Sequence, residues 1–304
     1  MQAQPPLPLP LPLPLPVRDG IAPSYIWIPE GHWDNVFSFL QAHFPDVSAS
    51  TWQARLDRQE VVDQHGKVLL ANSAVKRGMC IYYYREIENE TPIPFHEEIL
   101  FQDEHLLVVD KPHFLPVIPS GRFLRETLLV RLKKNTGLMD LTPIHRLDRE
   151  TAGVMLFSHN PATRGQYQSL FQRKSMAKTY HAIAKHLPEL VFPLRHYSHM
   201  EEADKFFVMR EVAGMANSET LLDIKERRGE HSLYQLQPVT GRKHQLRLHM
   251  SSLGAPILND AFYPVALPCK ADDFSAPLQL LAKSICFDDP ITGQQRYFES
   301  KKSL

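Results

Sequence analysis

The sequence is poor in cysteine and shows no excess of charge of either sign. Its 304 residues include three cysteines, Cys80, Cys269 and Cys286, without a CxxC pair, which argues against a disulfide framework and against a zinc ribbon. We therefore expect free thiols in a reducing, cytoplasmic setting. The 34 basic residues balance the 34 acidic ones, so any site for a polyanion has to be local rather than a property of the whole surface.

The motifs of several common enzyme classes are also missing. There is no GxGxxG, GxxxxGK(S/T) or GxSxG sequence, which argues against nucleotide-dependent and serine-hydrolase chemistry. His244 and His249 are five residues apart, with no HExxH motif and no cysteine nearby, so we expect no metal site. No apolar run is long enough to cross a membrane.

Composition divides the chain into three regions. Residues 1–20 contain a Leu-Pro alternation with no basic residue before it; proline at every second position prevents the helical core of a signal peptide, so we expect a disordered tail. Residues 24–88 show helical spacing and then strand-like runs, which predicts a small α/β module. A stretch with seven acidic and no basic residues, 86–104, precedes the remainder, which we assign as one domain over 95–304.

Strand and helix patterns alternate in the larger domain. Apolar runs at 99–101 and 106–109 predict a hairpin, 161–176 a helix, and 178–184 a strand. Thr240 is the expected cap of a further helix, which Gly254 ends.

Residues 145–158, HRLDRETAGVMLFS, hold the most informative pattern in the chain. Arg146 and Asp148 are two apart, so in an extended segment they share a face and place a nucleophile or base beside a fixed cation. Most Arg-x-Asp pairs are surface ion pairs worth less than about 1 kcal/mol. The apolar run 154–157 behind this one predicts a buried strand, and a carboxylate carried in that way is typical of an active site.

Basic residues gather in three places along the larger domain. Residues 238–260 contain a run of cations after Thr240 and Gly241 that suits a phosphate or a buried carboxylate; an exposed basic face is the alternative. Residues 122–149 and 161–186 are also rich in lysine and arginine. Two basic stretches flanking HRLD predict a groove that follows a nucleic-acid backbone.

Four motifs stand in order over about 200 residues: ILFQDEHLLVVDKP (99–112), PIHRLDRETAGVMLF (143–157), KTYHAIA (178–184) and PVTGRKHQLRLHMSSLGAPILNDAFYP (238–264). Together they resemble the RluA family of pseudouridine synthases, which isomerise uridine within RNA. The resemblance implies an α+β fold: a mixed, mostly antiparallel central sheet with flanking helices and a central RNA-binding cleft. Residues 24–88 resemble, more faintly, an alpha-L type RNA-binding module; a packing extension of the main domain is the alternative.

The resemblance also implies roles for single residues. Asp148 matches the catalytic aspartate, Arg146 the arginine that holds the duplex open, and Tyr180 the tyrosine that stacks on the flipped base. Arg242 matches the basic residue paired with the aspartate, and Leu246 an apolar residue near the pocket. We further expect RNA contacts from His145, Lys178, His244 and Gln245.

The expected protein is thus a cytoplasmic, monomeric RNA pseudouridine synthase without cofactor or metal. Its expected partner is a structured stem-loop of ribosomal or transfer RNA, because RNA is recognised largely by shape and unpaired bases. Two mechanisms stay open for the carboxylate, a covalent acylal and a glycal formed by loss of the 2′-proton. The alternative function is a non-catalytic RNA-binding or RNA-folding protein that uses the same cleft.

Overall fold

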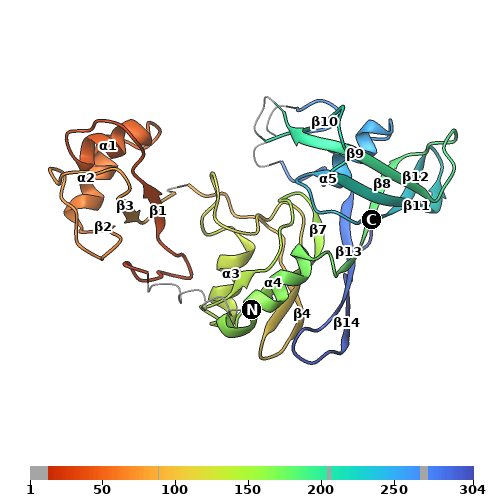
Figure 1. Cartoon of the computed structure of the whole chain (residues 1–304), viewed down its shortest axis with the longest axis horizontal. Helices are drawn as coiled ribbons and strands as arrows, with labels where there is room; N and C mark the ends of the chain where they lie inside the picture. Colours follow the sequence, from red (N-terminus) through yellow and green to blue (C-terminus); the bar gives the residue numbers. More distant parts are fainter. Residues whose placement is uncertain (1–12, 88, 204–206, 268–272) are drawn as a thin grey trace, which may run out of the picture. The chain divides into compact units, whose positions relative to one another are not determined.

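The computed structural model describes residues 13–87, 89–203, 207–267 and 273–304, in two compact units (Figure 1). The first unit ends at Asn89 and the second begins at Glu90. The predicted tail over 1–20 falls mostly outside the described residues, as does Cys269. Among the described residues, no helix is long and apolar enough to span a membrane.

The N-terminal unit is a three-stranded antiparallel sheet with two helices on one face. The strands β1 (Ser24–Trp27), β2 (Val61–Asp63) and β3 (Cys80–Tyr83) pair in the order β1-β3-β2. Helices α1 (Val36–His43) and α2 (Ala49–Asp57) begin at Asn35 and Ser48, whose side chains accept backbone N–H bonds. Phe39, Trp52 and Ile81 are fully buried between helices and sheet. This unit therefore has a core of its own.

Part of the expected disordered tail is ordered, which corrects the prediction for residues 13–20. Leu15 is 8% exposed and packs with Val62 and Tyr84. The Tyr84 hydroxyl donates to the carbonyl of Pro16 at 2.7 Å, and Arg18 forms an ion pair with Glu60 at 2.5 Å. One leucine of the Leu-Pro alternation, Leu15, therefore packs against the face of this sheet that the helices do not cover.

The second unit is built on a mixed sheet, and the predicted α+β class is confirmed. Its described residues form an 11-stranded sheet in which β10-β9-β11-β12-β8-β13-β7-β5-β4 are neighbours in that order, with β14 beside β13 and β6 beside β7. The pair β7–β13 is parallel and the other pairs are antiparallel. The strands are β4 (Glu98–Gln102), β5 (Leu106–Lys111), β6 (Thr142–Pro143), β7 (Ala152–Ser158), β8 (Ala177–Lys185), β9 (Leu194–Glu202), β10 (Met209–Val212), β11 (Ser218–Arg228), β12 (His231–Pro238), β13 (Leu280–Asp288) and β14 (Gln295–Glu299).

Strands β5 and β7 are buried along their whole length and mostly apolar, because both faces of the sheet are covered there. Alternate residues serve opposite faces. Val109 and Met155 pack toward helix α3 (Leu128–Thr136), whereas Val108 and Leu156 pack toward helix α4 (Pro161–Gln172) and its buried Tyr167. These two layers hold β7 rigidly, and the HRLD segment enters it directly.

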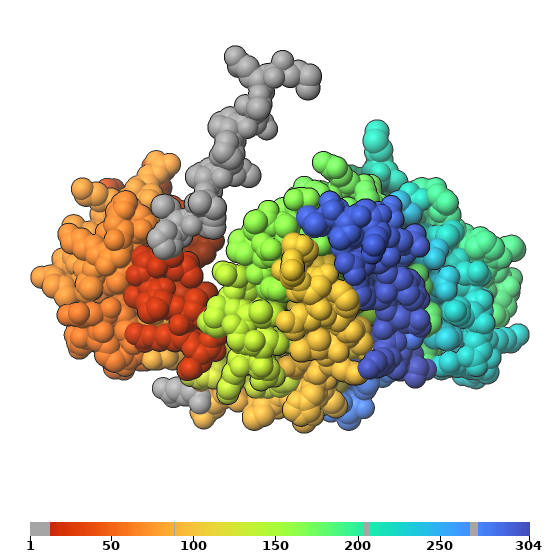
Figure 2. All heavy atoms as spheres, turned by 90° about the horizontal axis from the view of Figure 1, so that it is seen from below, coloured from red at the N-terminus to blue at the C-terminus, as the bar shows by residue number. Residues whose placement is uncertain are grey.

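The first and last segments of this unit lie side by side. Figure 2 shows the β4–β5 hairpin in gold next to the C-terminal strands in dark blue. Asp103, in the hairpin turn, forms an ion pair with Arg296 of β14 at 3.3 Å. Further along, the Ser300 hydroxyl donates to Asp110 at 2.9 Å, so the chain end is fastened to strand β5.

Helix α5 (Gln245–Ser252) begins four residues later than predicted. Thr240 does not cap it: the Thr240 hydroxyl donates to Gln245 Oε1 at 2.6 Å and accepts from the backbone N–H of Glu219. His244, in a left-handed conformation with φ of 54°, precedes the first helical residue. The cations expected in the first helical turn therefore lie in a loop. The helix ends before Gly254, whose φ of 88° matches the predicted terminating glycine.

Candidate active site

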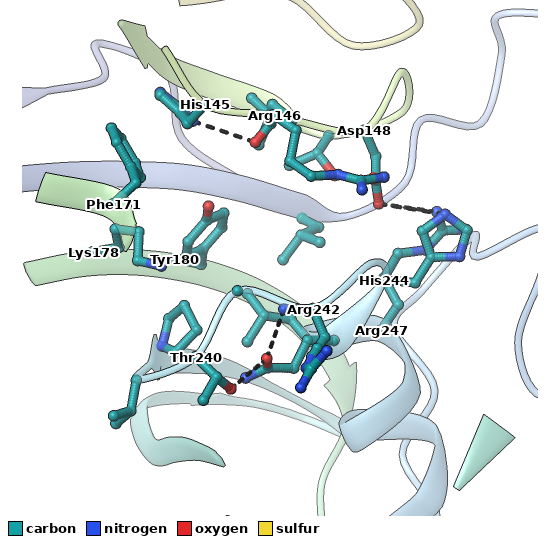
Figure 3. A pocket seen from close by; sticks show the side chains of 18 of the residues that line it. His145, Arg146, Asp148, Phe171, Lys178, Tyr180, Thr240, Arg242, His244 and Arg247 are labelled. Atoms are coloured by element: carbon teal, nitrogen blue, oxygen red, sulfur yellow. Dashed lines mark hydrogen bonds and ion pairs between the residues drawn. The ribbon is translucent and has the colours of Figure 1, made fainter. Parts of the chain in front are cut away.

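A pocket of about 400 Å³ opens where the HRLD loop, strand β8 and the start of helix α5 meet. This volume is within the range of about 300–1,000 Å³ usual for small-ligand sites. Figure 3 shows Asp148 at one end, facing His244 and Arg247, with Tyr180 in the middle and Phe171 and Lys178 at the other end. Residues nearly 100 positions apart are thus brought together, as the four motifs suggested.

The Asp148 loop is held by two basic side chains, one from the last residue of strand β5 and one from just after it. The buried Lys111 ammonium donates to the carbonyls of Pro112, Leu115 and Arg149 at 2.8–3.0 Å. The His113 ring bonds the carbonyl of Glu150 at 2.7 Å. Because two donors bond the residues directly after Asp148, the backbone that carries its carboxylate has a fixed course.

Asp148 faces two nitrogen-bearing side chains. Its Oδ2 lies 3.4 Å from Nη1 of Arg247 and 3.9 Å from Nε2 of His244. Its side chain is 21% exposed, so the carboxylate is open toward the pocket while being held on the other side. Burial lowers the pKa of His244 to about 4, and the ring is therefore neutral near pH 7.

The predicted pairing of Arg242 with Asp148 is wrong in this structure, where Arg247 takes that place. Arg242 is exposed, and its Nε donates to the carbonyl of Asn217 at 3.2 Å. The reason is the late start of helix α5, which leaves Arg242 in the preceding loop and puts Arg247 on the first helical turn. Arg242 still lines the pocket, on its rim.

Arg247 is itself neutralised by a second carboxylate. Its Nε and Nη2 donate to the two oxygens of Asp260 at 2.8 and 2.6 Å, and the arginine is 2% exposed. Its guanidinium also stacks 4.7 Å from the ring of Phe262. A bidentate pair of this kind fixes the plane of the guanidinium, which leaves Nη1 directed at Asp148.

Tyr180 and Lys178 are neighbours on one face of strand β8 and both line the pocket. Burial, together with the charge of Asp148, raises the pKa of the Tyr180 hydroxyl, which is therefore protonated at neutral pH. Burial also lowers the pKa of Lys178. Tyr180 offers a flat apolar ring and a hydroxyl, and Lys178 offers a cation for a polar substrate atom.

The other residues predicted to contact RNA differ in whether their side chains are open to the pocket or already bonded within the protein. Arg146 is exposed at the pocket mouth, and Leu246, 7% exposed, lines the pocket. His145 stacks on Phe171 with ring centres 4.6 Å apart, and its Nε2 accepts the backbone N–H of Leu156 at 3.0 Å. That ring is engaged on its Nε2 side by the protein itself.

The predicted RNA contact of Gln245 is also corrected, because both ends of its side-chain amide are hydrogen-bonded within the protein. Its Oε1 accepts from the Thr240 hydroxyl and the Arg242 N–H, and its Nε2 donates to the Glu219 carbonyl and the Thr220 hydroxyl. It is 4% exposed. Gln245 therefore shapes the loop that carries Arg242 instead of offering polar atoms to RNA.

Three residues that matter for this geometry were missed by the sequence reasoning. Arg247 belongs to the basic run in residues 238–260, for which no single role is predicted. Asp260 and Lys111 are not among the predicted site residues. Lys111 ends a buried strand, and a charged residue in that position indicates a structural or functional role that the sequence alone could have shown. The Arg247–Asp260 pair has no equally clear signal, since it depends on how the chain folds back after Gly254.

Comparisons with known proteins show the family to which this chain is related. Residues 105–252 match the family described as RNA pseudouridylate synthase. The dual-specificity RNA pseudouridine synthase RluA of Haemophilus influenzae is 33% identical over 226 residues, which cover 72% of this chain and 99% of that protein. The tRNA pseudouridine synthase C of Vibrio vulnificus is 34% identical, over 65% of this chain and 87% of that one.

A solved structure shows the same fold. Human RNA pseudouridylate synthase domain containing 4 aligns with a TM-score of 0.52 and 29% identity, over 67% of this chain and 87% of that chain. Fold, pocket and sequence together define an RNA-modifying isomerase. The chain belongs to the RluA-type family of RNA pseudouridine synthases.

Proposed function

We propose that the enzyme isomerises specific uridines in structured ribosomal or transfer RNA, with Asp148 as the catalytic carboxylate. The observation that carries this proposal is the position of Asp148: its carboxylate is open to the pocket, 3.4 Å from the buried Arg247 and across from Tyr180. Relatives named as a dual-specificity RNA synthase and as a tRNA synthase support RNA as the substrate and transfer RNA as one class of it.

The reaction breaks one bond to the anomeric carbon, forms another, and moves two protons. The bond between N1 of uracil and the anomeric carbon of ribose breaks, the base turns, and carbon 5 bonds to the same carbon. Carbon 5 then loses its proton and N1 gains one. Asp148 acts in one of two ways. It is a nucleophile whose bond to the anomeric carbon breaks again when carbon 5 attacks, or it is the base that removes the 2′-proton and later returns it. Both routes need a carboxylate held in one orientation, which the Arg247 contact supplies.

The rest of the pocket suits a base taken out of its stack. Flipping a nucleotide costs a few kcal/mol of unstacking, which contact with the Tyr180 ring and Leu246 offsets. The Tyr180 hydroxyl can relay the proton that leaves carbon 5, accepting it as its own proton passes on toward N1 or solvent. In this proposal Arg146, which is exposed at the mouth, fills the gap that the flipped base leaves, and Lys178 binds a polar atom of the nucleotide.

The substitution Asp148→Asn tests the role of the carboxylate. Tritium release from RNA labelled at carbon 5 of uridine should fall by a factor of about 10³ or more, because an amide is neither a nucleophile nor a base here. The matched control is Asp223→Asn, on strand β11, whose exposed carboxylate accepts the backbone N–H of Ile224. That variant should release tritium at the wild-type rate.

Binding of the same RNA separates the enzyme from a binding-only protein. Asp148→Asn should retain RNA affinity while turnover is lost. Turnover near the wild-type rate would refute the catalytic role of Asp148. Wild-type protein that binds RNA but releases no tritium from any RNA pool would instead favour an RNA-folding role for the same pocket.

A further inference from the structure

Two histidines and a glutamate converge behind helix α5, away from the pocket. His196 lies on strand β9, Glu211 on β10 and His249 on α5, and one donor atom of each lies within 4.8 Å of the other two. None of the three lines the pocket described above. They come from three elements, so the spacing argument against a metal between His244 and His249 does not apply to them.

The strand register explains this convergence. Glu211 pairs with Met200 across β10 and β9, and His196 pairs with Thr220 across β9 and β11. His196 and Met200 are four residues apart on one strand, so their side chains share a face, and the cross-strand partners lie on that face too. His249 reaches the same face from α5, two residues after Arg247 and therefore on nearly the opposite side of the helix.

We propose that His196, Glu211 and His249 bind a divalent transition-metal ion, with zinc as the ion that suits them best. Two imidazole nitrogens and a carboxylate oxygen are a donor set that zinc accepts. Bonds of about 2.0–2.2 Å in a tetrahedral site put neighbouring donors about 3.3 Å apart. Here Glu211 Oε1 lies 3.0 Å from His196 Nε2 and 3.9 Å from His249 Nε2, so small side-chain movements complete the geometry.

The surroundings of His249 have the features of a supported ligand. Its side chain is fully buried, and its Nδ1 lies 2.9 Å from the Thr220 hydroxyl, which leaves Nε2 directed at Glu211. Metal-bound histidines are usually oriented through their second nitrogen in this way. His196 and Glu211 are 19% and 22% exposed, which provides an entry path and a place for water as a fourth ligand.

The competing arrangement is a metal-free hydrogen-bond network. The hydroxyls of Ser198 and Ser218 lie 3.1 and 3.0 Å from His249 Nε2, and the Glu211–His196 contact is itself an ion pair when the ring is protonated. These contacts hold the cluster together without an ion. A direct binding measurement decides between the two.

The role of the ion would be structural. It would join β9 and β10 to helix α5, and Thr220 is linked through Gln245 to the loop that carries Arg242. Bound metal should therefore raise the midpoint of thermal unfolding, a readout that does not depend on turnover.

The experiment uses the full chain, stripped with a chelator and titrated with Co²⁺ and then with Zn²⁺. We expect saturation at one equivalent, ligand-field absorption of a low-coordinate Co²⁺ site, and displacement of Co²⁺ by Zn²⁺. His196→Gln and Glu211→Gln should each weaken binding by more than about tenfold and should abolish the rise in unfolding midpoint. The matched control, His231→Gln on strand β12, should bind as the wild type does.

Two results would overturn the site. The first is wild-type protein that shows no saturable binding of either ion. The second is tight binding that neither His196→Gln nor Glu211→Gln weakens, which would place the ion elsewhere. Circular dichroism in chelator shows whether each variant is folded, and the wild-type titration decides the question if a variant is not.

Discussion

Arg247 contacts two carboxylates, and at the scale of single residues it is the centre of the site. Asp260, whose side chain is fully buried, holds its guanidinium through two hydrogen bonds, and Asp148 lies against the remaining nitrogen. Removing one member of a buried pair leaves the other charge without compensation. Arg247 therefore contributes both to the stability of the fold and to the orientation of the proposed catalytic group.

We predict that Arg247→Met lowers the free energy of unfolding by about 3–5 kcal/mol, because Asp260 remains buried and unpaired. The matched substitution Arg242→Met, at the exposed rim, should change it by no more than about 0.5 kcal/mol. Urea unfolding followed by circular dichroism measures both values. Equal losses in the two variants would contradict the pairing seen here and would favour Arg242 as the partner of a buried carboxylate.

The residues that could be predicted are those with a chemical signature in the sequence itself. Asp148 and Tyr180 sit in short motifs beside buried strands, and the structure places both in one pocket. The partner of Asp148 could not be predicted, because Arg242 and Arg247 are both basic and five residues apart. Only the true start of the helix, set by the bonds of Gln245 rather than by Thr240, distinguishes them.

At the scale of elements, strand β7 depends on a glycine where it leaves the HRLD loop. Gly153 has a φ of 113°, and a Cβ at this position would lie 2.2 Å from the carbonyl oxygen of Ala282 on β13. The parallel β7–β13 contact is made at this point. A side chain would push the two strands apart at the start of β7, five residues after Asp148.

We predict that Gly153→Ala lowers the free energy of unfolding by about 2–5 kcal/mol, from backbone strain and overpacking together. Turnover should fall as well, because the loop that carries Asp148 shifts. The control is Gly165→Ala in helix α4, where a Cβ meets no atom within 4 Å. That variant should gain up to about 1 kcal/mol from helix propensity. A Gly153→Ala protein as stable as the wild type would refute the close approach.

Elements with strong periodicity were predictable and their boundaries less so. The β4–β5 hairpin, helix α4 and strand β8 lie where the apolar spacing placed them. The order of strands was not predictable from spacing. Strand β8 lies between β12 and β13, and both of these come much later in the chain than β8. Such pairings depend on the packing of whole faces rather than on local pattern.

At the scale of the whole molecule, stability should depend on pH through buried neutral histidines. Burial lowers the pKa of both His145 and His244 to about 4, against an ordinary value of 6.5. Between these values the unfolded chain takes up protons that the folded protein does not. The contribution is therefore fully present above about pH 6.5 and is lost as the pH falls toward 4.

We predict that lowering the pH from about 7 to about 5 costs roughly 1–3 kcal/mol of unfolding free energy through His244 alone, whose side chain is 8% exposed. Urea unfolding at the two pH values measures the total. His244→Gln should reduce the pH dependence by that amount. An identical pH dependence in the variant and the wild type would show that His244 is not held neutral in the folded state.

The two units should also fold independently, because each has its own core. The buried cluster around Trp52 contains residues of the N-terminal unit alone, and the clusters around Met155 and Tyr234 contain residues of the second unit alone. We predict that a fragment of residues 90–304 folds cooperatively, with a urea midpoint equal to that of the corresponding transition in the full chain. Circular dichroism and tryptophan fluorescence distinguish the transitions, since all three tryptophans, Trp27, Trp33 and Trp52, belong to the N-terminal unit. If the fragment does not fold, or unfolds at clearly lower urea, the N-terminal unit is instead a packing extension of the catalytic domain.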